Sequence, residues 1–437
     1  MQPDLNLLVT SAHAPQAYST IRALRPLARK IVVSGYPVKA LLGRLPHAAY
    51  SRLVDRRYSV PSPVGDWQAG RIQRANSEAE EAYVTAMLGI CEREGITAVF
   101  PCWDPDVYVL SKNRERFARL GVLVPVPDFD ITLAALDKYR TVEAALAVGF
   151  PCPRTYLCEN DADARRIAAE EGFPLVIKPR FTSGARGLHV VRDEGELLGR
   201  LDFAQDGRYR PMLQEFIPGG RKQSLQFLVD RKGQLCFAFH KRRVRSFRVN
   251  TRFGTVSESA PLPPYCGKVA ELVKTMNWWG GGGVEVLHDP RDGAFKLMEM
   301  NARFARQLWN RTELGINEPQ ACLEIARGHE CPPLPQYPLG VLFVSPYEDL
   351  LLCGLQLADL AAWRLRGLLG GTPPGDASNA PLPLRELLPG FFSTYRRGRT
   401  RVLDPCFRHF FQDPVVSLIW WLQFGTWVAG ACRQLGR

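Results

Sequence analysis

Two short strands joined by a tight turn constrain the fold of this chain more than any other part of its sequence. Residues 284–288 (VEVLH) and 295–300 (FKLMEM) alternate apolar and polar side chains across a DPRDG turn, which predicts an antiparallel β-hairpin. Glu285 lies on the first strand, and Glu299 and Asn301 lie two residues apart on the second. Because residues two apart share one face of a strand and cross-strand neighbours lie about 5 Å apart, these side chains can converge on one point.

The three converging groups have the chemistry of a metal site. Two carboxylates and an amide carbonyl are hard oxygen ligands, which suit Mg2+ bound together with phosphate oxygens. Arg303, two residues beyond Asn301, could contact the same phosphates. On these residues alone, a surface hairpin with alternating charges is an equally good interpretation.

Upstream segments carry groups that could bind a nucleotide. Lys178 ends an apolar strand at 174–178 (PLVIK), and the glycine-containing loop 181–187 follows it. Backbone N–H groups of such a loop can bind phosphate, and a lysine adds positive charge. Lys138, near the start of a predicted helix, is either a phosphate ligand or an ordinary surface lysine. Residues 214–217 (QEFI) precede Pro-Gly-Gly and could offer backbone groups to an adenine, although an ordinary strand and turn also fits.

The first part of the chain predicts a parallel sheet. Short apolar runs at 5–10 (LNLLVT), 30–34 (KIVVS) and 97–101 (TAVFP) alternate with helical stretches at 19–27 and 87–94. Strands that alternate with helices are typical of an α/β domain. The loop after the first run, SAHAP, lacks the G-x-G-x-x-G pattern, so a dinucleotide-binding function is not supported.

The order of these features resembles the ATP-grasp superfamily over about residues 100–330. Lys138 comes first, then Lys178 with its loop, then the 214–217 segment and finally the acidic hairpin. The most specific piece is GVE at 283–285 followed by LMEMNARF at 297–304. It is similar to the metal-binding hairpin of carbamoyl-phosphate-synthetase-like enzymes and carboxylate–amine ligases.

The resemblance implies an α/β and α+β architecture with a parallel amino-terminal domain before a two-subdomain ATP-grasp fold. We expect the amino-terminal domain at 1–130 and the ATP-grasp domain at 131–332. Within the latter, a lid subdomain would cover about 131–210 and a metal-binding subdomain about 211–332. A proline-rich boundary then introduces a mainly helical C-terminal appendage at 333–437.

The resemblance also implies roles for individual residues. The implied ATP-binding residues are Lys138, Lys178, Thr182, Ser183, Gly184, Gly187, Gln214, Glu215, Phe216 and Ile217. Glu285, Glu299 and Asn301 would bind Mg2+, with Mn2+ as an alternative. Arg303 and Lys178 would be the catalytic residues that contact the transferring phosphoryl group.

The reaction implied by the family is phosphorylation of a carboxylate followed by displacement of the phosphate by an amine or thiol. We therefore expect an ATP- and Mg2+-dependent carboxylate–amine ligase that forms a C–N bond through an acyl-phosphate and releases ADP and phosphate. Its partners would be a small-molecule carboxylate and an amine, and a homodimer is an open alternative. The rival interpretations are an ATP-binding scaffold without catalysis at a membrane, and an ATP-grasp kinase that stops at phosphoryl transfer.

One basic segment bears on the substrate. The sequence HKRR at 240–243 follows a strand that leads toward the site, so Lys241 or Arg242 could face the substrate carboxylate or its phosphate. A solvated basic loop is an equally good interpretation. Ala302 departs from the family pattern, which usually has proline after the metal-binding asparagine.

Composition limits the partners and the compartment. The chain has 437 residues and a formal charge of +12, which suits anionic partners. No RNP-like run, C2H2 spacing or long basic block occurs, so we expect no nucleic acid. Eleven cysteines show no metal or redox spacing, and the N-terminus lacks a signal-peptide pattern, which together favour a cytoplasmic protein with reduced thiols.

An uncharged segment near the C-terminus has three interpretations. Residues 414–432 contain no charged side chain and include three tryptophans, and basic residues flank them. They could form a helix packed on the body of the protein, an interfacial helix on an anionic membrane, or a membrane span. From the basic, aromatic character of 391–437 we predict peripheral association with an anionic membrane surface.

Overall fold

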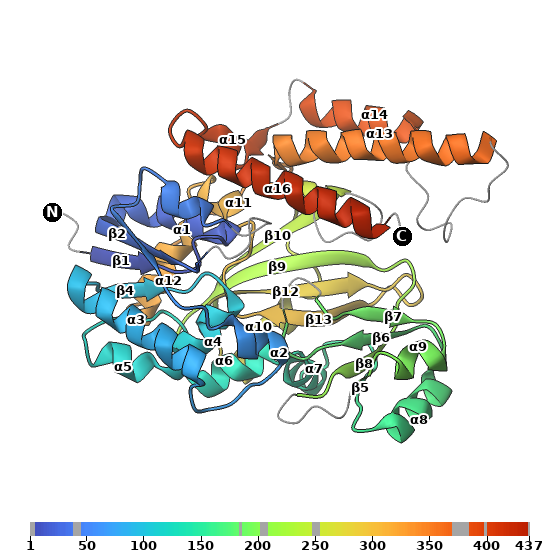
Figure 1. The fold of residues 1–437 in the computed structure, drawn as a ribbon, viewed down its shortest axis with the longest axis horizontal. Coiled ribbons are helices and arrows are strands. Elements are labelled where there is room, and N and C mark those ends of the chain that lie inside the picture. Colours follow the sequence, from blue (N-terminus) through green and yellow to red (C-terminus); the bar gives the residue numbers. More distant parts are fainter. Residues whose placement is uncertain are drawn as a thin grey trace.

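The computed structural model describes residues 5–37, 45–182, 186–201, 209–246, 254–368, 384–396 and 400–435. Its strands form three sheets, and the C-terminal helices lie together along one side of the molecule (Figure 1). The amino-terminal parallel α/β unit precedes a small sheet and a large sheet. This arrangement confirms the predicted fold class, a parallel α/β domain followed by two further α+β units.

The amino-terminal unit is built on a parallel sheet of order β3-β2-β1-β4. Its strands are β1 (Leu5–Val9), β2 (Ala28–Gly35), β3 (Arg56–Ser59) and β4 (Ala98–Phe100). Its helices are α1 (Pro15–Leu24), η1 (Arg25–Leu27), η2 (His47–Tyr50), α2 (Val64–Ala69), α3 (Glu78–Glu94), α4 (Asp104–Lys112) and α5 (Arg114–Ala118). The bounds of α3 follow from its sequence, because Ser77 and Glu80 form a capping box at its start and Gly95 ends it in the left-handed conformation.

A smaller unit follows, after helices α6 (Phe129–Leu136) and α7 (Lys138–Ala147). Its four-stranded antiparallel sheet has the order β5-β8-β6-β7. The strands are β5 (Thr155–Leu157), β6 (Leu175–Lys178), β7 (His189–Val191) and β8 (Met212–Glu215), with helices α8 (Asp161–Glu171) and α9 (Glu194–Leu198). This sheet packs its buried Ile177 and Leu213 against Ala164 and Ile167 of α8, so the unit has a hydrophobic core of its own.

The central sheet has seven strands in the order β13-β12-β9-β10-β11-β14-β15. They are β9 (Arg221–Val229), β10 (Leu235–Ser246), β11 (Gly254–Ser259), β12 (Gly280–His288), β13 (Phe295–Asn301), β14 (Leu342–Val344) and β15 (Arg401–Leu403). The accompanying helices are α10 (Cys266–Thr275), α11 (Trp309–Thr312) and α12 (Glu318–Ala326). The alternating β12 and β13 pair as an antiparallel hairpin across the DPRDG turn, as the sequence predicts.

The C-terminal region extends the central sheet and adds helices to it. Strand β14 pairs with β11, and β15 pairs with β14, so the sheet continues beyond residue 332, where the sequence analysis places a domain boundary. The helices are α13 (Pro346–Leu368), α14 (Leu384–Tyr395), α15 (Pro405–Arg408) and α16 (Pro414–Leu435). No helix among the described residues, α16 included, is long and apolar enough to cross a membrane.

Asp413 joins the C-terminal region to the amino-terminal unit. Its carboxylate accepts hydrogen bonds from the Tyr18 hydroxyl (3.0 Å), the Ser51 hydroxyl (2.6 Å) and the Arg52 backbone N–H (2.7 Å). Helix α16 follows directly and packs on η2, where the Trp420 and His47 rings lie 5.0 Å apart. One face of α16 is therefore packed on the body of the protein.

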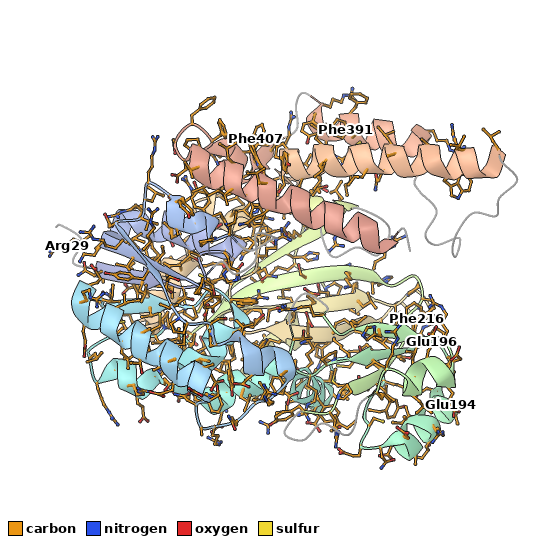
Figure 2. The ribbon with its side chains drawn as sticks, in the orientation of Figure 1. Arg29, Glu194, Glu196, Phe216, Phe391 and Phe407 are labelled. Atoms are coloured by element: carbon orange, nitrogen blue, oxygen red, sulfur yellow. The ribbon has the colours of Figure 1, made fainter. Side chains whose placement is uncertain are left out.

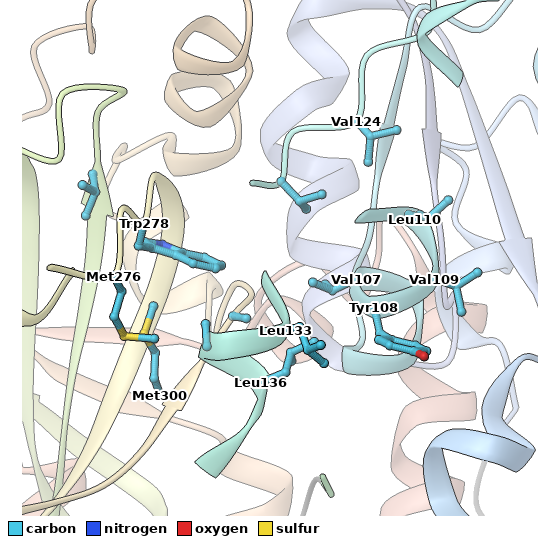
Figure 3. Close-up of a cluster of buried hydrophobic side chains, with 14 of the residues drawn as sticks. Val107, Tyr108, Val109, Leu110, Val124, Leu133, Leu136, Met276, Trp278 and Met300 are labelled. Carbon is cyan, nitrogen blue, oxygen red and sulfur yellow. The ribbon is translucent and has the colours of Figure 1, made fainter. Parts of the chain in front are cut away.

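A hydrophobic core connects the amino-terminal and central units (Figure 3). The labelled side chains come from α4, α6, β13, the segment before α6 and the connection from α10 to β12, and they are Val107, Tyr108, Val109, Leu110, Val124, Leu133, Leu136, Met276, Trp278 and Met300. Because close-packed interiors resist relative movement, this shared core fixes the first turn of α4 relative to the β12–β13 hairpin.

Candidate active site

The β12–β13 hairpin carries the acidic residues singled out in the sequence. In the ladder, Glu285 is paired directly with Glu299, and Gly283 is paired with Asn301. The two carboxylates are therefore cross-strand neighbours, and Asn301 lies two residues from Glu299 on the same strand.

Four consecutive glycines, 280–283, lead into this hairpin and allow other residues to pack closely on β12. A Cβ atom at Gly281 would overlap the Phe304 ring, and one at Gly283 would overlap the side-chain amide of Gln226. The glycine run thus lets neighbouring segments lie against the strand immediately before Glu285.

Two buried lysines lie beside Glu299. The Nζ atoms of Lys138 and Lys178 lie 3.9 Å and 3.8 Å from its Oε2 atom. Lys178 Nζ donates to the Met298 carbonyl oxygen (2.8 Å), and Lys138 Nζ donates to the Thr182 carbonyl oxygen (2.7 Å). Both ammonium groups are therefore held toward the hairpin from different elements, α7 and β6.

Burial and charge set the protonation of this cluster. Burial lowers the pKa of Lys178 to about 8, although Glu299 opposes the shift. Burial disfavours ionisation of Glu299, but Lys138 and Lys178 outweigh it and lower its pKa. For Glu285, burial and then the charge of Glu299 raise the pKa. The two carboxylates thus differ in acidity, as expected when like charges lie together in a buried site.

The donor set fits a cation that shares its ligands with a nucleotide. Among the described residues, no group of three or more His, Cys, Asp or Glu side chains could hold a metal ion. Mg2+ usually takes one or two carboxylates and completes its shell with waters and substrate phosphates. Glu285, Glu299 and the Asn301 amide match that requirement and would hold Mg2+ together with phosphate oxygens.

Arg303 is fixed by the amino-terminal unit. Its Nε atom lies 2.7 Å from Asp104 Oδ1 and its Nη2 atom lies 3.2 Å from Asp104 Oδ2, which is a bidentate ion pair. Burial opposes the charge on Arg303, but Asp104 outweighs burial and raises its pKa. Asp104 lies in the first turn of α4, so the shared core described above controls where this guanidinium points.

These groups line one pocket of about 380 Å3, a volume suited to small molecules. Of the candidate site residues, it is lined by Lys138, Lys178, Thr182, Lys241, Glu285, Glu299, Asn301 and Arg303. Its far wall comes from elsewhere in the chain, with His47 of η2 and Glu348, Asp404 and Trp420 of the C-terminal region. The pocket therefore extends well beyond the hairpin.

The segment 214–217 does not contribute to the lining of this pocket. Glu215 is buried and bound instead by Arg154 (2.9 Å), Arg291 (3.3 Å) and Lys296 (3.2 Å). The pairs with Arg291 and Lys296 join β8 of the small sheet to the turn of the hairpin and to β13. Binding of adenine by this segment stays a prediction.

The loop predicted to bind phosphate is only partly described. Ser183 and Gly184 lie outside the described residues, whereas Thr182 lines the pocket. Gly187 does not line it. Gly187 has a φ of 69°, and a Cβ atom there would lie 2.9 Å from Pro179 Cγ, so a backbone requirement explains this glycine.

Arg242 is a correction to the sequence interpretation. It is exposed and pairs with Glu258 (2.5 Å), whereas its neighbours Lys241 and Arg243 line the pocket. Successive side chains of a strand point to opposite faces, so Lys241 and Arg242 could not both face one site. The Lys241 ammonium donates a hydrogen bond to the side-chain oxygen of Gln307.

Sequence reasoning missed a row of polar residues on β9. Lys222, Gln223, Ser224 and Gln226 line the pocket, while Leu225 and Phe227, on either side of Gln226, are fully buried. The sequence shows an alternation only over 224–227, which indicates the face of Ser224 and Gln226. Pocket residues of the C-terminal region carried no comparable signal, because they come from the ends of separate helices.

Comparisons with known proteins agree with this architecture. Residues 137–310 match the family described as carbamoyl-phosphate synthase L chain, ATP binding domain, and residues 75–125 match the PylC-like N-terminal domain family. The biotin carboxylase of Pseudomonas aeruginosa is 29% identical over 268 residues, which are 56% of this chain and 58% of that protein. The chloroplastic biotin carboxylase of Arabidopsis thaliana is 32% identical over 257 residues, 53% of this chain and 45% of that protein. The chain thus spans about half the length of the curated relatives it matches.

Solved structures show the same fold. The biotin carboxylase domain dimer of Hydrogenobacter thermophilus 2-oxoglutarate carboxylase, in complex with MgADP, ADP and bicarbonate, has a TM-score of 0.57 at 20% identity. That match covers 76% of this chain and 71% of the other. A biotin carboxylase complex from Campylobacter jejuni gives 0.58 at 17% identity, covering 75% and 72%. At these identities the likeness concerns the fold alone.

Proposed function

Because this chain belongs to the ATP-grasp superfamily, we propose that it is a Mg2+- and ATP-dependent ligase that joins a small carboxylate to an amine and releases ADP and phosphate. The observation that carries the proposal is the meeting of two carboxylates, two buried lysines and Arg303 around one pocket. Phosphoryl transfer depends mainly on positioning and on neutralising charge, and these groups supply both.

Each group has a task in this reaction. Lys138 and Lys178 would neutralise phosphate oxygens of ATP, and Arg303, oriented by Asp104, would contact the transferring phosphoryl group. Glu285, Glu299 and Asn301 would hold Mg2+, which when bound withdraws charge from the phosphate oxygens. Lys241 would face the carboxylate substrate.

The bond changes balance without a further reactant. An oxygen of the substrate carboxylate attacks the γ-phosphorus, and the bond from that phosphorus to the ADP oxygen breaks. The amine nitrogen then attacks the acyl carbon, the C–O bond to phosphate breaks, and phosphate and a proton leave. Closing the pocket against water protects the acyl-phosphate between the two steps.

The extent of the pocket favours the ligase over its two rivals. An ATP-binding scaffold needs no space beyond the nucleotide, and a kinase needs room for one acceptor, whereas a ligase must hold an acid and an amine; this pocket continues past Lys241 to the C-terminal region. Bicarbonate, which is present in the Hydrogenobacter complex, is itself a small carboxylate and belongs among the acids to be tested.

We expect the protein to convert ATP to ADP and phosphate only when a suitable acid and amine are both supplied. The assay incubates protein, ATP and Mg2+ with pooled amino acids, small carboxylates and bicarbonate, and quantifies ADP, AMP, phosphate and new masses. A condensed product with ADP supports the ligase. Phosphorylation of the acid without condensation would favour the kinase, and Mg2+-dependent binding of ATP without turnover would favour the scaffold.

Lys178→Ala should reduce turnover in that assay at least about a hundredfold, because it removes a charge aimed at the transferring group. Lys268→Ala is the matched control, since Lys268 lies on α10 and pairs with Glu271 (2.8 Å) at the surface. Near-normal turnover of the Lys178 variant would contradict the assignment.

We further propose that the C-terminal region associates with anionic membrane surfaces. Exposed apolar side chains gather on its helices and their connections, namely Leu350, Leu357, Trp363, Leu365, Leu368, Phe392, Phe407, Phe411, Val415, Leu418 and Leu422. Phe407 lies on α15 (Figure 2). Apolar side chains combined with a net charge of +12 suit an anionic interface.

Sedimentation with vesicles tests this association. We expect binding to vesicles that contain phosphatidylserine, weaker binding at higher salt, and little binding to phosphatidylcholine alone. Phe411→Asp combined with Leu422→Asp should reduce binding, whereas Leu120→Asp, an exposed leucine of the amino-terminal unit, should not. Equal binding by wild type and the double variant would contradict the proposal.

A further inference from the structure

The far wall of the pocket is built by residues that neither matched family includes. Glu348 lies in the first turn of α13, Asp404 directly precedes α15, and Trp420 lies on α16. The two family matches cover only 75–125 and 137–310. The two family matches therefore do not account for this wall, and its chemistry should report on the substrate.

The charges of this wall are unbalanced. Glu348 and Asp404 are both buried, and Arg306 pairs with Glu348, with its Nη2 atom 3.7 Å from Glu348 Oε1. Asp404 uses Oδ1 to accept from the backbone N–H groups of Cys406 (3.0 Å) and Phe407 (3.2 Å). Burial, followed by the charge of Glu348, raises the pKa of Asp404 to about 8. Asp404 thus lies beside a second carboxylate in a place that disfavours net negative charge.

An imidazole supplies a second, independent indication of a ligand. His47 is 1% exposed and lines the pocket, and within the described residues its Nδ1 atom makes no hydrogen bond. Its ring contacts Trp420 (5.0 Å), which in turn hydrogen-bonds Glu348. Burial, with the nearby His13 and Arg306, lowers the pKa of His47 to about 3, so its ring is neutral. Buried polar atoms are nearly always paired in folded proteins, so an unpaired one that lines a cavity points to a bound partner.

We propose that Glu348, Asp404 and His47 form a subsite for the protonated amino group of the acceptor substrate. A primary ammonium group has three N–H donors, and two carboxylates with one neutral imidazole can offer three acceptors. The ammonium charge also balances the second carboxylate, and the Trp420 ring provides an apolar wall for the adjoining carbon atoms. The identification of the bound amine as a substrate rests on the proposed ligase function, whereas its binding here does not.

Calorimetric titration of the full chain in the presence of ADP and Mg2+ tests the subsite. The probes are primary amines (glycine, the L-amino acids other than proline, putrescine and ethanolamine), and each amine that binds is compared with its analogue in which hydroxyl replaces the amino group. We expect at least one amine to bind and its hydroxyl analogue to bind at least about tenfold more weakly, because hydrogen bonds to charged groups are the stronger ones.

Three variants keep the shapes of the side chains while removing the acceptors. Glu348→Gln and Asp404→Asn should each weaken binding of that amine at least about tenfold, and His47→Phe, which preserves the ring on Trp420, should weaken it less. Glu324→Gln is the matched control, since Glu324 lies on α12 and pairs with Arg327 (2.9 Å) away from the pocket. Melting temperatures measured alongside separate loss of binding from loss of folding.

The outcomes distinguish this proposal from the proposed function. No binding by any amine of the panel, or unchanged binding in Glu348→Gln and Asp404→Asn, overturns the subsite. Amine binding that depends on these residues, in a protein that never forms ADP, supports the subsite and contradicts the ligase. Full ligase turnover with unchanged KM for the amine in both variants supports the ligase and overturns the subsite.

Discussion

Glu299→Gln is expected to lower the rate of ADP formation by about a hundred- to a thousandfold, the range found when one group that stabilises transition-state charge is removed. Glu299 is the carboxylate closest to both active-site lysines, at 3.9 Å from Lys138 Nζ and 3.8 Å from Lys178 Nζ. Its pairing opposite Glu285 makes it the only side chain on the hairpin that can contact the cation and both lysines at once, among the described residues. A neutral amide keeps its shape but removes the charge that attracts the cation.

The measurement compares initial rates and Mg2+-dependent binding of ATP in the variant and the wild type. Both lysines keep hydrogen bonds to backbone carbonyls in the variant, so the melting temperature should change little. Glu324→Gln, which also removes one carboxylate, should leave both readouts unchanged. A Glu299 variant with wild-type turnover would mean that the hairpin is not the reaction centre.

Asp349→Ala should lower the free energy of unfolding by about 3–5 kcal/mol, the usual cost of removing one partner from a buried ion pair. The Asp349 carboxylate lies at the start of α13 and binds Arg245 through two contacts of 2.7 Å. It also accepts from the Thr255 hydroxyl (2.7 Å) and the Tyr395 hydroxyl (3.0 Å). Alanine would leave the nearly buried Arg245 guanidinium without its carboxylate, and β10, β11, α13 and α14 would lose their common contact.

Urea-induced unfolding followed by tryptophan fluorescence measures this effect. The matched control is Glu258→Ala, which removes the partner of the exposed Arg242 and should cost no more than about 1 kcal/mol. If the two variants unfold at the same urea concentration, the Asp349 contacts do not hold the C-terminal helices on the sheet.

The hairpin and the amino-terminal sheet were predictable because each follows a local periodicity. An alternation of period two fixes which side chains of β12 and β13 share a face, and therefore which residues can meet Glu285. The same rule applied to β10 would have separated Arg242 from Lys241. The run HKRR contains no apolar residue to mark a buried face, so the sequence does not show that β10 continues through it to Ser246.

Other parts of the site depend on contacts that no local pattern reveals. Arg303 is positioned by Asp104, which lies 199 residues earlier in the chain. Strands β14 and β15 have three residues each, too short for a periodicity, and they are recruited by the edge of a sheet that already exists. The segment 214–217 stands where the order of ATP-grasp elements predicts an adenine-binding segment. That order does not show that Glu215 forms ion pairs with Arg154, Arg291 and Lys296.

The hydrogen bonds of Asp413 have a consequence for the order in which the protein is made. Asp413 binds Tyr18 and Ser51, which the ribosome adds 395 and 362 residues earlier. Amino-terminal domains generally fold first during synthesis, and contacts across long sequence separations form late. The surface of the amino-terminal unit that binds α16 therefore stays exposed until most of the chain has been synthesised. The wall of the pocket that carries Trp420 closes only after translation has passed that residue, so an incompletely synthesised chain exposes an open site and an unfilled apolar surface that chaperones would recognise.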